Sequence, residues 1–249
     1  MRAEIQSRFG DFKVDLSAPI DISMPLHAGA GHASAWYVGP ARFEPVRMGD
    51  WVGEVRSGAP VNFRTVILNP HGNGTHTECV GHISAEDYTI NSCLKAFFFI
   101  SRVISIEPAL QASGDRVITL EQVKAVFTPG DCEALAIRTL PNTNEKLSRN
   151  YSDTNPAYLD PLAAAFLKDS GINHLLIDLP SVDKEKDAGK LLSHKAFWTY
   201  PEQPRLNATI TELIYIPKAV HDGKYFMNIQ IASLENDASP SKVLLFNVS

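Results

Sequence analysis

The chain contains 249 residues, of which 44% are hydrophobic and 20% are charged. A globular chain of this size buries roughly 70% or more of its unfolded surface, so it can form a large core without disulfides. The 28 acidic and 23 basic residues give a formal net charge of -5, and the basic residues form no cluster in the sequence. This balance argues against a protein that binds the phosphate backbone of nucleic acid.

The sequence shows no targeting segment and no boundary between domains. Residues 1–8 contain no apolar segment, and the most apolar run, residues 94–106, is interrupted by basic residues. We therefore expect no signal peptide, no membrane partner and a cytoplasmic location. No repeat or Pro/Gly-rich linker divides the chain, which predicts a single domain over residues 1–249. The cysteines fit a reducing compartment, because their spacing matches neither a disulfide framework nor a thiolate zinc site: Cys79, Cys93 and Cys132.

The first half of the chain predicts two strands. Residues 64–68 are rich in β-branched side chains and stop before Pro70, which has no N–H for a strand ladder. We expect a strand there that leads into a loop. Residues 96–106 combine a continuous apolar run with a later alternation, which is typical of a strand buried in the core.

Two helices and a pair of parallel strands are predicted next. Thr119 and Gln122 match a capping box, so a short helix should begin after Thr119. Residues 160–171 begin with Asp-Pro, continue with good helix formers and end at glycine, which is typical of a second helix. Buried strands are predicted on both sides of it, over residues 132–138 and 172–180. Such a strand–helix–strand unit is usually parallel.

The C-terminal third predicts strands only. Residues 209–216, 225–231 and 242–248 alternate apolar and polar side chains. The fold class is therefore mixed α/β.

The densest group of side chains that could bind a metal or take part in catalysis lies in residues 71–82, HGNGTHTECVGH. Imidazole and carboxylate are the usual ligands of Zn²⁺ and related ions. In an extended segment His76 and Glu78 point to the same side, and a turn at Gly81 can bring His82 back to them. The segment predicts a metal site, and the alternative is a glycine-rich turn whose histidines only form hydrogen bonds. The spacing differs from the helical H-E-x-x-H pattern, which excludes a zincin.

Several neighbouring residues have simpler interpretations. Cys79 is expected to be a small buried side chain rather than a thiol nucleophile, because in a strand it faces away from His76 and Glu78. Four aromatic residues could line a pocket for a planar substrate, or equally pack in the core or an interface: Trp36, Tyr37, Phe43 and Trp51. We expect structural roles for the other histidines: His27, His32, His174 and His221.

The segment resembles the signature of the cyclase family of metal-dependent hydrolases, H-x-G-T-H-x-D-x-P-x-H, whose members include bacterial kynurenine formamidases and isatin hydrolases. The resemblance implies a mixed α/β domain, described in that family as a swivelling β/β/α fold. In this segment Gly74, Thr75, His76 and His82 lie in register with the signature. Other matching blocks follow in the family's order: Val14–Ser17 with Met24-Pro25, Ala136–Thr139, Ile177–Asp183, and then His194 and Glu212.

The segment also departs from the signature. The family aspartate is replaced by Glu78, which is one methylene longer, and the family proline is replaced by Val80. Gly72 occupies the register of the first histidine, and His71 lies one residue earlier. A glutamate at this position would need a shifted backbone or a different number of metals, and His71 could reach the site through the glycines.

The resemblance implies one or two divalent metals per chain, with zinc expected and manganese or iron as alternatives. The first metal would be held by His71, His76 and Glu78. A second metal position, or the acid and base of the reaction, would come from His82, His194 and Glu212.

The catalytic roles are likewise implied by the resemblance. Glu212 is the expected general base, and His82 or His194 would protonate the leaving group. Taken alone, Glu212 would be an outward residue on an alternating strand, and His194 a helix-surface or loop residue. Asp178 and Asp183 are expected to support the structure or orient a ligand.

The implied activity is hydrolysis of a carbon–nitrogen amide bond by a metal-activated water. The expected substrate is a small arylformamide such as N-formylkynurenine, whose hydrolysis to kynurenine belongs to tryptophan catabolism, and a lactone or cyclic amide is a close alternative. A metal-dependent lyase or dehydratase on the same scaffold and a non-catalytic metal-binding homologue also stay open. The expected assembly is a homodimer or homotetramer.

Overall fold

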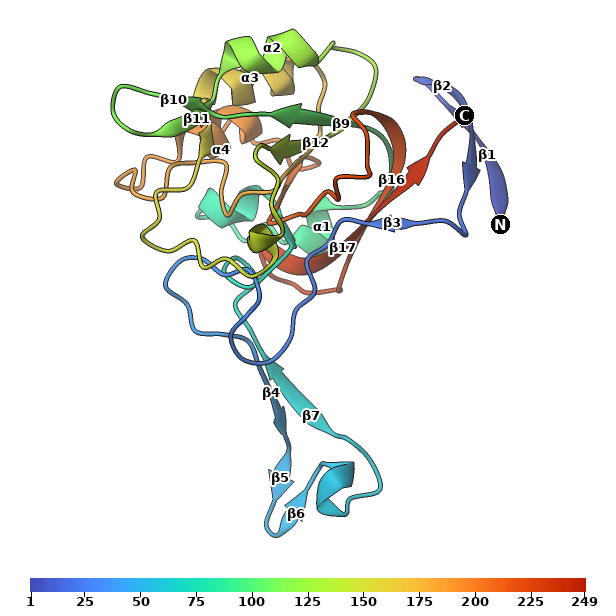
Figure 1. Cartoon of the computed structure of the whole chain (residues 1–249), viewed down its shortest axis with the longest axis vertical. Coiled ribbons are helices and arrows are strands. Elements are labelled where there is room, and N and C mark those ends of the chain that lie inside the picture. Colours follow the sequence, from blue (N-terminus) through green and yellow to red (C-terminus); the bar gives the residue numbers. More distant parts are fainter.

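Seven strands close into a ring at the centre of the structure, a computed structural model that describes residues 1–249 (Figure 1). Strands β9, β12, β14 and β15 are parallel neighbours, as the predicted strand–helix–strand unit requires. Strand β3 (Ile20–Asp21) adds to β17 outside the ring. Around the ring the order is β16 (Gly223–Ile231), β9 (Phe98–Ile106), β12 (Ala134–Thr139), β14 (His174–Ile177), β15 (Thr209–Glu212), β8 (His76–Glu78) and β17 (Ala238–Asn247), which pairs again with β16.

Three helices lie together against one side of the ring: α2 (Leu120–Val126), α3 (Pro161–Asp169) and α4 (Leu192–Trp198) (Figure 1). The capping box at Thr119 is confirmed, because Gln122 and Thr119 exchange side-chain and backbone hydrogen bonds. Asp160 caps the predicted second helix. No helix has the length and apolar character needed to cross a membrane. Short turns complete the helical elements: α1 (Ile90–Cys93), η1 (Val55–Ser57), η2 (Val80–Ile83) and η3 (Asn144–Leu147).

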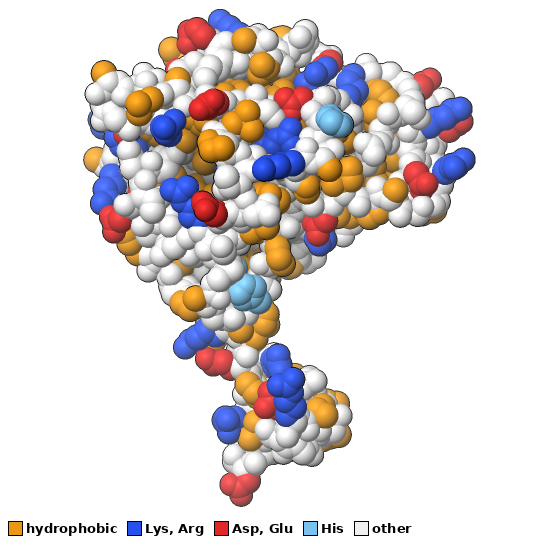
Figure 2. Space-filling view, viewed as in Figure 1, with side chains coloured by type: hydrophobic (Ala, Val, Ile, Leu, Met, Phe, Trp, Pro, Cys, Tyr) orange, Lys and Arg blue, Asp and Glu red, His pale blue; other side chains and the backbone are white.

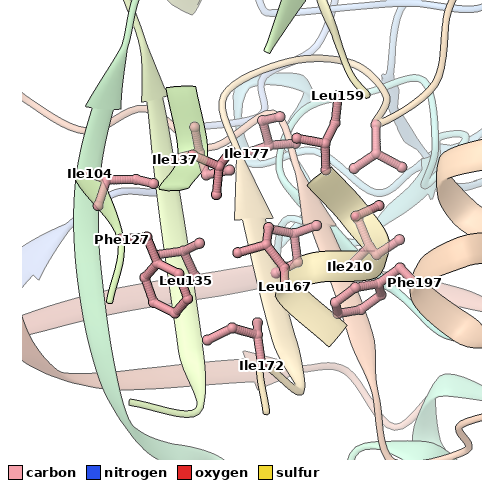
Figure 3. Packing of buried hydrophobic residues seen from close by; sticks show 14 of the residues in the cluster. Ile104, Phe127, Leu135, Ile137, Leu159, Leu167, Ile172, Ile177, Phe197 and Ile210 are labelled. Carbon is pink, nitrogen blue, oxygen red and sulfur yellow. The ribbon is translucent and has the colours of Figure 1, made fainter. Parts of the chain in front are cut away.

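Both faces of the central strands are buried. On β12, Leu135 and Ile137 pack against the helices, in a cluster that includes Leu167 of α3 (Figure 3). The alternate residues Ala134 and Ala136 belong to a second apolar cluster on the opposite face. A strand covered on two sides has few solvated positions, which explains the continuous apolar runs in the sequence.

The predicted strand 209–216 is shorter than expected, and its alternation does not correspond to exposure. All four residues of β15 are buried, because β14 and β8 flank it and both of its faces are covered. Its polar side chains find partners inside, as in the 2.8 Å contact between the Thr211 and Thr77 hydroxyls. The strand ends at Glu212 because Leu213 adopts a left-handed backbone with φ 53°. The remaining C-terminal strands are confirmed as β16 and β17.

A narrow arm, residues 42–67, extends from the body (Figures 1 and 2). The strand predicted at 64–68 is confirmed as its strand β7 (Arg64–Ile67), but all four residues of that strand are exposed. The other arm strands are β4 (Arg42–Pro45), β5 (Arg47–Met48) and β6 (Trp51–Val52), and the small sheets of the body contain β1 (Arg2–Ser7), β2 (Gly10–Asp15), β10 (Ala109–Leu110), β11 (Arg116–Ile118) and β13 (Tyr158–Leu159).

The aromatic residues considered as a pocket wall divide between two places. Phe43 and Trp51 lie on strands of the arm. Trp36 packs against a small apolar cluster of the body, and the exposed Tyr37 hydroxyl donates to Glu185 at 2.9 Å. These side chains therefore do not form one wall.

Candidate metal centre

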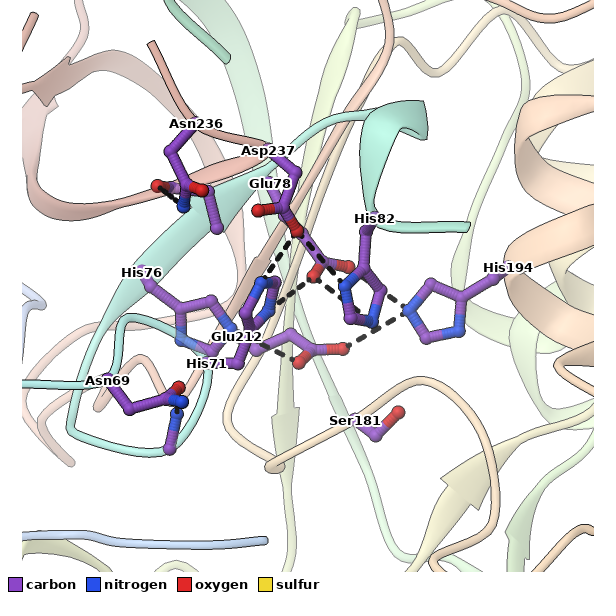
Figure 4. Close-up of polar contacts among 12 residues, drawn as sticks. Asn69, His71, His76, Glu78, His82, Ser181, His194, Glu212, Asn236 and Asp237 are labelled. Carbon is purple, nitrogen blue, oxygen red and sulfur yellow. Dashed lines mark hydrogen bonds and ion pairs between the residues drawn. The ribbon is translucent and has the colours of Figure 1, made fainter. Parts of the chain in front are cut away.

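The residues predicted to bind metal converge on one place, although four elements and a loop supply them (Figure 4). Strand β8 places His76 and Glu78 on the same side, as expected for an extended segment. In the adjacent strand, Glu212 pairs directly with His76. The remaining three come from the loop before β8, from η2 and from α4: His71, His82 and His194.

Glu78 lies at the centre of the site. Its Oε1 is 3.1 Å from Nε2 of His194. Its Oε2 is 3.1 Å from Nδ1 of His71 and 3.8 Å from Nε2 of His82. Because this carboxylate is completely buried, it has no access to water and depends on these three imidazoles for its charge balance.

His76 and Glu212 form a second histidine–carboxylate pair in the site. The His76 Nδ1–H donates to the Gly74 carbonyl at 3.0 Å, so Nε2 is directed into the site. That nitrogen is 3.4 Å from Glu212 Oε2. The other oxygen, Oε1, accepts from the Val182 backbone N–H at 3.0 Å. Both side chains are buried, so the interpretation of Glu212 as an outward strand residue is wrong.

His194 is held by Asp183. Its Nδ1–H donates to Asp183 Oδ2 at 2.6 Å, and the same carboxylate accepts from the Ser193 backbone N–H at 2.8 Å. The interpretation of His194 as a surface or loop residue is wrong, because the inner face of α4 carries it into the site with only 2% exposure. A carboxylate behind a histidine fixes the ring and directs its other nitrogen forward.

Two glycines determine how the loop histidines reach the site. A Cβ at Gly72 would lie 2.3 Å from Cγ2 of Val38, so no side chain fits at this position. His71 therefore supplies the imidazole from one residue earlier. A Cβ at Gly81 would lie 2.0 Å from the Tyr88 carbonyl oxygen, so the turn that carries His82 also requires glycine.

Asp237 is a site residue that the sequence reasoning missed. Its Oδ2 is 2.8 Å from Nε2 of His71 and 3.3 Å from Nδ1 of His82. It precedes β17, far from the motif in sequence, and no spacing rule connects the two. Only the pairing of Ala238 with Glu78 across β17 and β8 brings it there.

Cys79 is confirmed as a buried side chain. Contact with the Cys93 thiol and burial both raise the pKa of the Cys79 thiol. A thiol of this kind stays protonated and is a poor nucleophile. The supporting role expected for Asp178 fits its position, since its carboxylate accepts from the Lys146 ammonium at 2.7 Å, in a buried pair.

Without a metal, the charges in the site favour the protonated forms of His71 and His194. Burial alone would lower the pKa of His71, but its hydrogen bonds to Asp237 and Glu78 raise the pKa to about 10. For His194, hydrogen bonds to Asp183 and Glu78 likewise outweigh burial and raise the pKa to about 10. The pKa of Glu78 is lowered well below its usual range, since its histidine partners outweigh burial.

The donor set fits a divalent cation. His76 Nε2 is a buried atom without a hydrogen-bond partner, and Glu78 Oε2 makes only the ion-pair contacts with His71 and His82. A buried polar atom without a partner is in a rare and unfavourable state. Imidazole and carboxylate together suit Zn²⁺, Mn²⁺ or Fe²⁺. Three overlapping groups have ligand atoms within 4.8 Å of one another: His71, His76 and Glu78; Glu78, His82 and His194; and His71, His82 and Asp237.

Metal uptake should release protons, because a protonated imidazole cannot bind a cation. At pH 7.5 we expect His71 and His194, each with a pKa near 10, to lose a proton when metal binds, and the apparent affinity to rise with pH. Titration calorimetry in buffers of different ionisation enthalpy measures this release. A buffer-independent enthalpy would contradict the prediction.

The same shifts predict how the stability of the metal-free protein depends on pH. A histidine whose pKa rises from 6.5 to about 10 on folding contributes stability that is complete below pH 6.5 and is lost as the pH rises through 10. Metal-free protein should therefore melt at lower temperature at pH 10 than at pH 6. Metal-loaded protein should lose less over this range.

Comparisons with known proteins support the fold. The profile of a family described as "Putative cyclase" matches residues 14–184. A search of curated proteins gives no match. The predicted metal-dependent hydrolase from Bacillus stearothermophilus has a similar structure, with a TM-score of 0.63 and 17% identity over 92% of this chain and 98% of that chain.

Two isatin hydrolase structures are also similar. One, bound to the product analogue thioisatinate, has a TM-score of 0.67 and 12% identity over 93% of this chain and 92% of its own. Isatin hydrolase A from Ralstonia solanacearum has a TM-score of 0.66 and 12% identity, over 92% of this chain and 91% of that chain. The mixed α/β fold predicted from the sequence is thereby confirmed.

Proposed function

The chain belongs to the cyclase family, and on this basis we propose that it is a metal-dependent hydrolase that cleaves a carbon–nitrogen amide bond. The observation that carries the proposal is the buried Glu78, surrounded by three imidazoles and lying beside His76, whose Nε2 has no hydrogen-bond partner. The similar folds of a predicted metal-dependent hydrolase and of isatin hydrolases support it. We propose an arylformamide such as N-formylkynurenine as the substrate, because its amide nitrogen is bonded to an aromatic ring, as it is in isatin.

The metal, expected to be zinc, would be held by imidazole nitrogens and carboxylate oxygens that point into the site. When bound, a divalent ion would lower the pKa of a water molecule towards roughly 7 and polarise the substrate carbonyl. The residues that would hold one or two such ions are His71, His76, Glu78 and His194.

His82 is the best-placed proton donor to the leaving nitrogen. Its side chain is 30% exposed, so it contacts both the site and the solvent. His194 is 2% exposed, and its nitrogens are directed at Asp183 and Glu78, so it has no route for exchanging a proton with solvent. Of the two candidates, the surroundings favour His82 as the acid.

Glu212 is the proposed general base. The Val182 N–H fixes one of its oxygens, and the carboxylate therefore keeps one orientation while it removes a proton from the attacking water. The other oxygen remains near His76 and is free to accept that proton. A fixed carboxylate within reach of the nucleophile is what general base catalysis requires.

The proposal is tested by metal analysis followed by a substrate panel. Protein loaded with zinc or manganese is incubated with N-formylkynurenine, other arylformamides, isatin and lactones, and the products are identified by mass spectrometry. Equal amounts of formate and kynurenine would support the proposal. An alkene product would identify a lyase, and metal-loaded protein that converts nothing in the panel would favour a non-catalytic homologue.

We also propose that the chain forms a homodimer through the arm. Phe63 and Val66 in the arm are 53% and 55% exposed, and Met48 is 60% exposed. An isolated two-stranded hairpin is marginally stable in water, and burying these apolar side chains against a second copy would stabilise the arm. Opposite charges pair along the arm, as in Arg64 with Glu54 at 3.6 Å, so two copies would not repel each other.

Substituting Phe63→Glu and Val66→Lys together should convert the dimer to a monomer, because both place charge on the apolar surface. Light scattering coupled to size exclusion measures the mass. Leu110→Lys is a matched control, since Leu110 is 65% exposed on the body. A double variant with the wild-type mass would contradict an arm-mediated dimer, and a wild-type mass four times that of one chain would indicate a tetramer.

A further inference from the structure

Asp237 supports an inference beyond the family signature. We propose that Asp237 is a positioning residue, which fixes His71 and His82 and determines the nitrogen that each ring presents to the site. The inference rests on the proposed metal site but does not depend on the substrate. It also explains how His71 can serve although it lies one residue outside the family register.

The geometry assigns one nitrogen of each ring to Asp237. Its Oδ2 accepts from His71 Nε2–H at 2.8 Å and from His82 Nδ1–H at 3.3 Å. The opposite nitrogens face Glu78 Oε2, at 3.1 Å for His71 and 3.8 Å for His82. Figure 4 shows the contacts of both rings with these two carboxylates as dashed lines. His71 is thus turned to offer Nδ1, and His82 to offer Nε2.

The two rings also constrain each other. Their centroids are 4.2 Å apart and their planes differ by 29°, which is a stacked arrangement. A 180° flip of either ring about its Cβ–Cγ bond would keep the stack but break the ring's hydrogen bond to Asp237. One carboxylate therefore holds two imidazoles in a single orientation.

His71 needs such support because the polar contacts of its ring are only those with Glu78 and Asp237. It precedes Gly72, where Val38 leaves no space for a side chain. The backbone of Asp237, in contrast, is anchored to the centre of the site. Its carbonyl accepts from the Cys79 N–H at 3.0 Å, next to Glu78. Asp237 can therefore transmit a fixed position to the His71 ring.

The test measures metal affinity of the full-length protein. Asp237→Asn keeps the size of the side chain but removes its charge, and carboxylates behind metal-binding histidines typically raise affinity about 10–100-fold. We expect zinc and cobalt to bind about 10–100-fold more weakly, as measured by competition with a chelator. Glu235→Gln is the matched control on the same loop, because Glu235 contacts only Thr89 and Asn91, and it should bind metal like the wild type.

A second readout identifies the nitrogens directly. In zinc-loaded protein labelled with ¹⁵N-histidine, His71 should bind zinc through Nδ1 and carry its proton on Nε2. The His71→Gln spectrum assigns the signal. If Asp237→Asn fails to fold, this spectrum of the wild type still decides the question, because coordination through Nε2 would make Asp237 a direct ligand and overturn the proposal.

The outcomes separate this inference from the proposed function. A folded Asp237→Asn variant that binds metal with wild-type affinity, and whose cobalt-loaded form has the wild-type absorption spectrum, would overturn the inference. This holds even if the enzyme hydrolyses formamides. Weaker metal binding in a protein that converts no amide would support the inference and remove the proposed function. Asp237→Glu, which restores the charge, should recover part of the lost affinity.

Discussion

Replacing Glu78 with alanine should remove bound metal and lower amide hydrolysis by about 10³-fold or more. Glu78 contacts His71, His82 and His194 at once, and its loss leaves those imidazoles without the carboxylate that they share. Metal ions contribute several kcal/mol to such reactions, and each 1.4 kcal/mol corresponds to about tenfold in rate. Elemental analysis after dialysis measures the metal, and kcat/KM measures the activity.

A more discriminating variant is Glu78→Asp, which restores the family residue. The shorter side chain would withdraw the carboxylate from His71 and His194, both of which are 3.1 Å away. We expect weaker metal binding, although the motif would then match the family better. Glu86→Ala is the control, since Glu86 is exposed and bonds only its local turn. Full metal content and activity in Glu78→Ala would show that the site is assigned wrongly.

The local fold was predictable because its signals are short-range. The capping box at Thr119 and the Asp160-Pro161 start of α3 each lie within a few residues of the helix they begin. The closure of the ring was not predictable, because β17 pairs with both β16 and β8. Such pairing depends on contacts between segments far apart in sequence, which no local pattern encodes.

The residues of the site likewise fall into those that the sequence could identify and one that it could not. His76, Glu78 and His82 could be found because one short segment carries them, and the family resemblance drew attention to His194 and Glu212. Asp237 could not be found, since its place depends on the register between β17 and β8. The structure also gives a physical reason for the displaced histidine, because Val38 occupies the space that a side chain at position 72 would need.

Glu212→Gln should retain metal and lose about 10²–10⁴-fold in kcat, which is the usual contribution of a general base. Glutamine has the same shape, so its oxygen can still accept from the Val182 N–H, but an amide cannot take the proton of the attacking water. Because Glu78 and His71 keep their contact at 3.1 Å, at least one metal should stay bound.

The separation between metal content and turnover is what distinguishes a base from a ligand. Elemental analysis and kcat are measured on the same sample, with the exposed Glu202→Gln as the control. If metal and activity fall together, Glu212 is required to hold the ion and the base must be another group. If both are retained, the carboxylate beside His76 has no part in the chemistry. Only retained metal with lost turnover fits a carboxylate that the backbone of Val182 orients towards a water molecule.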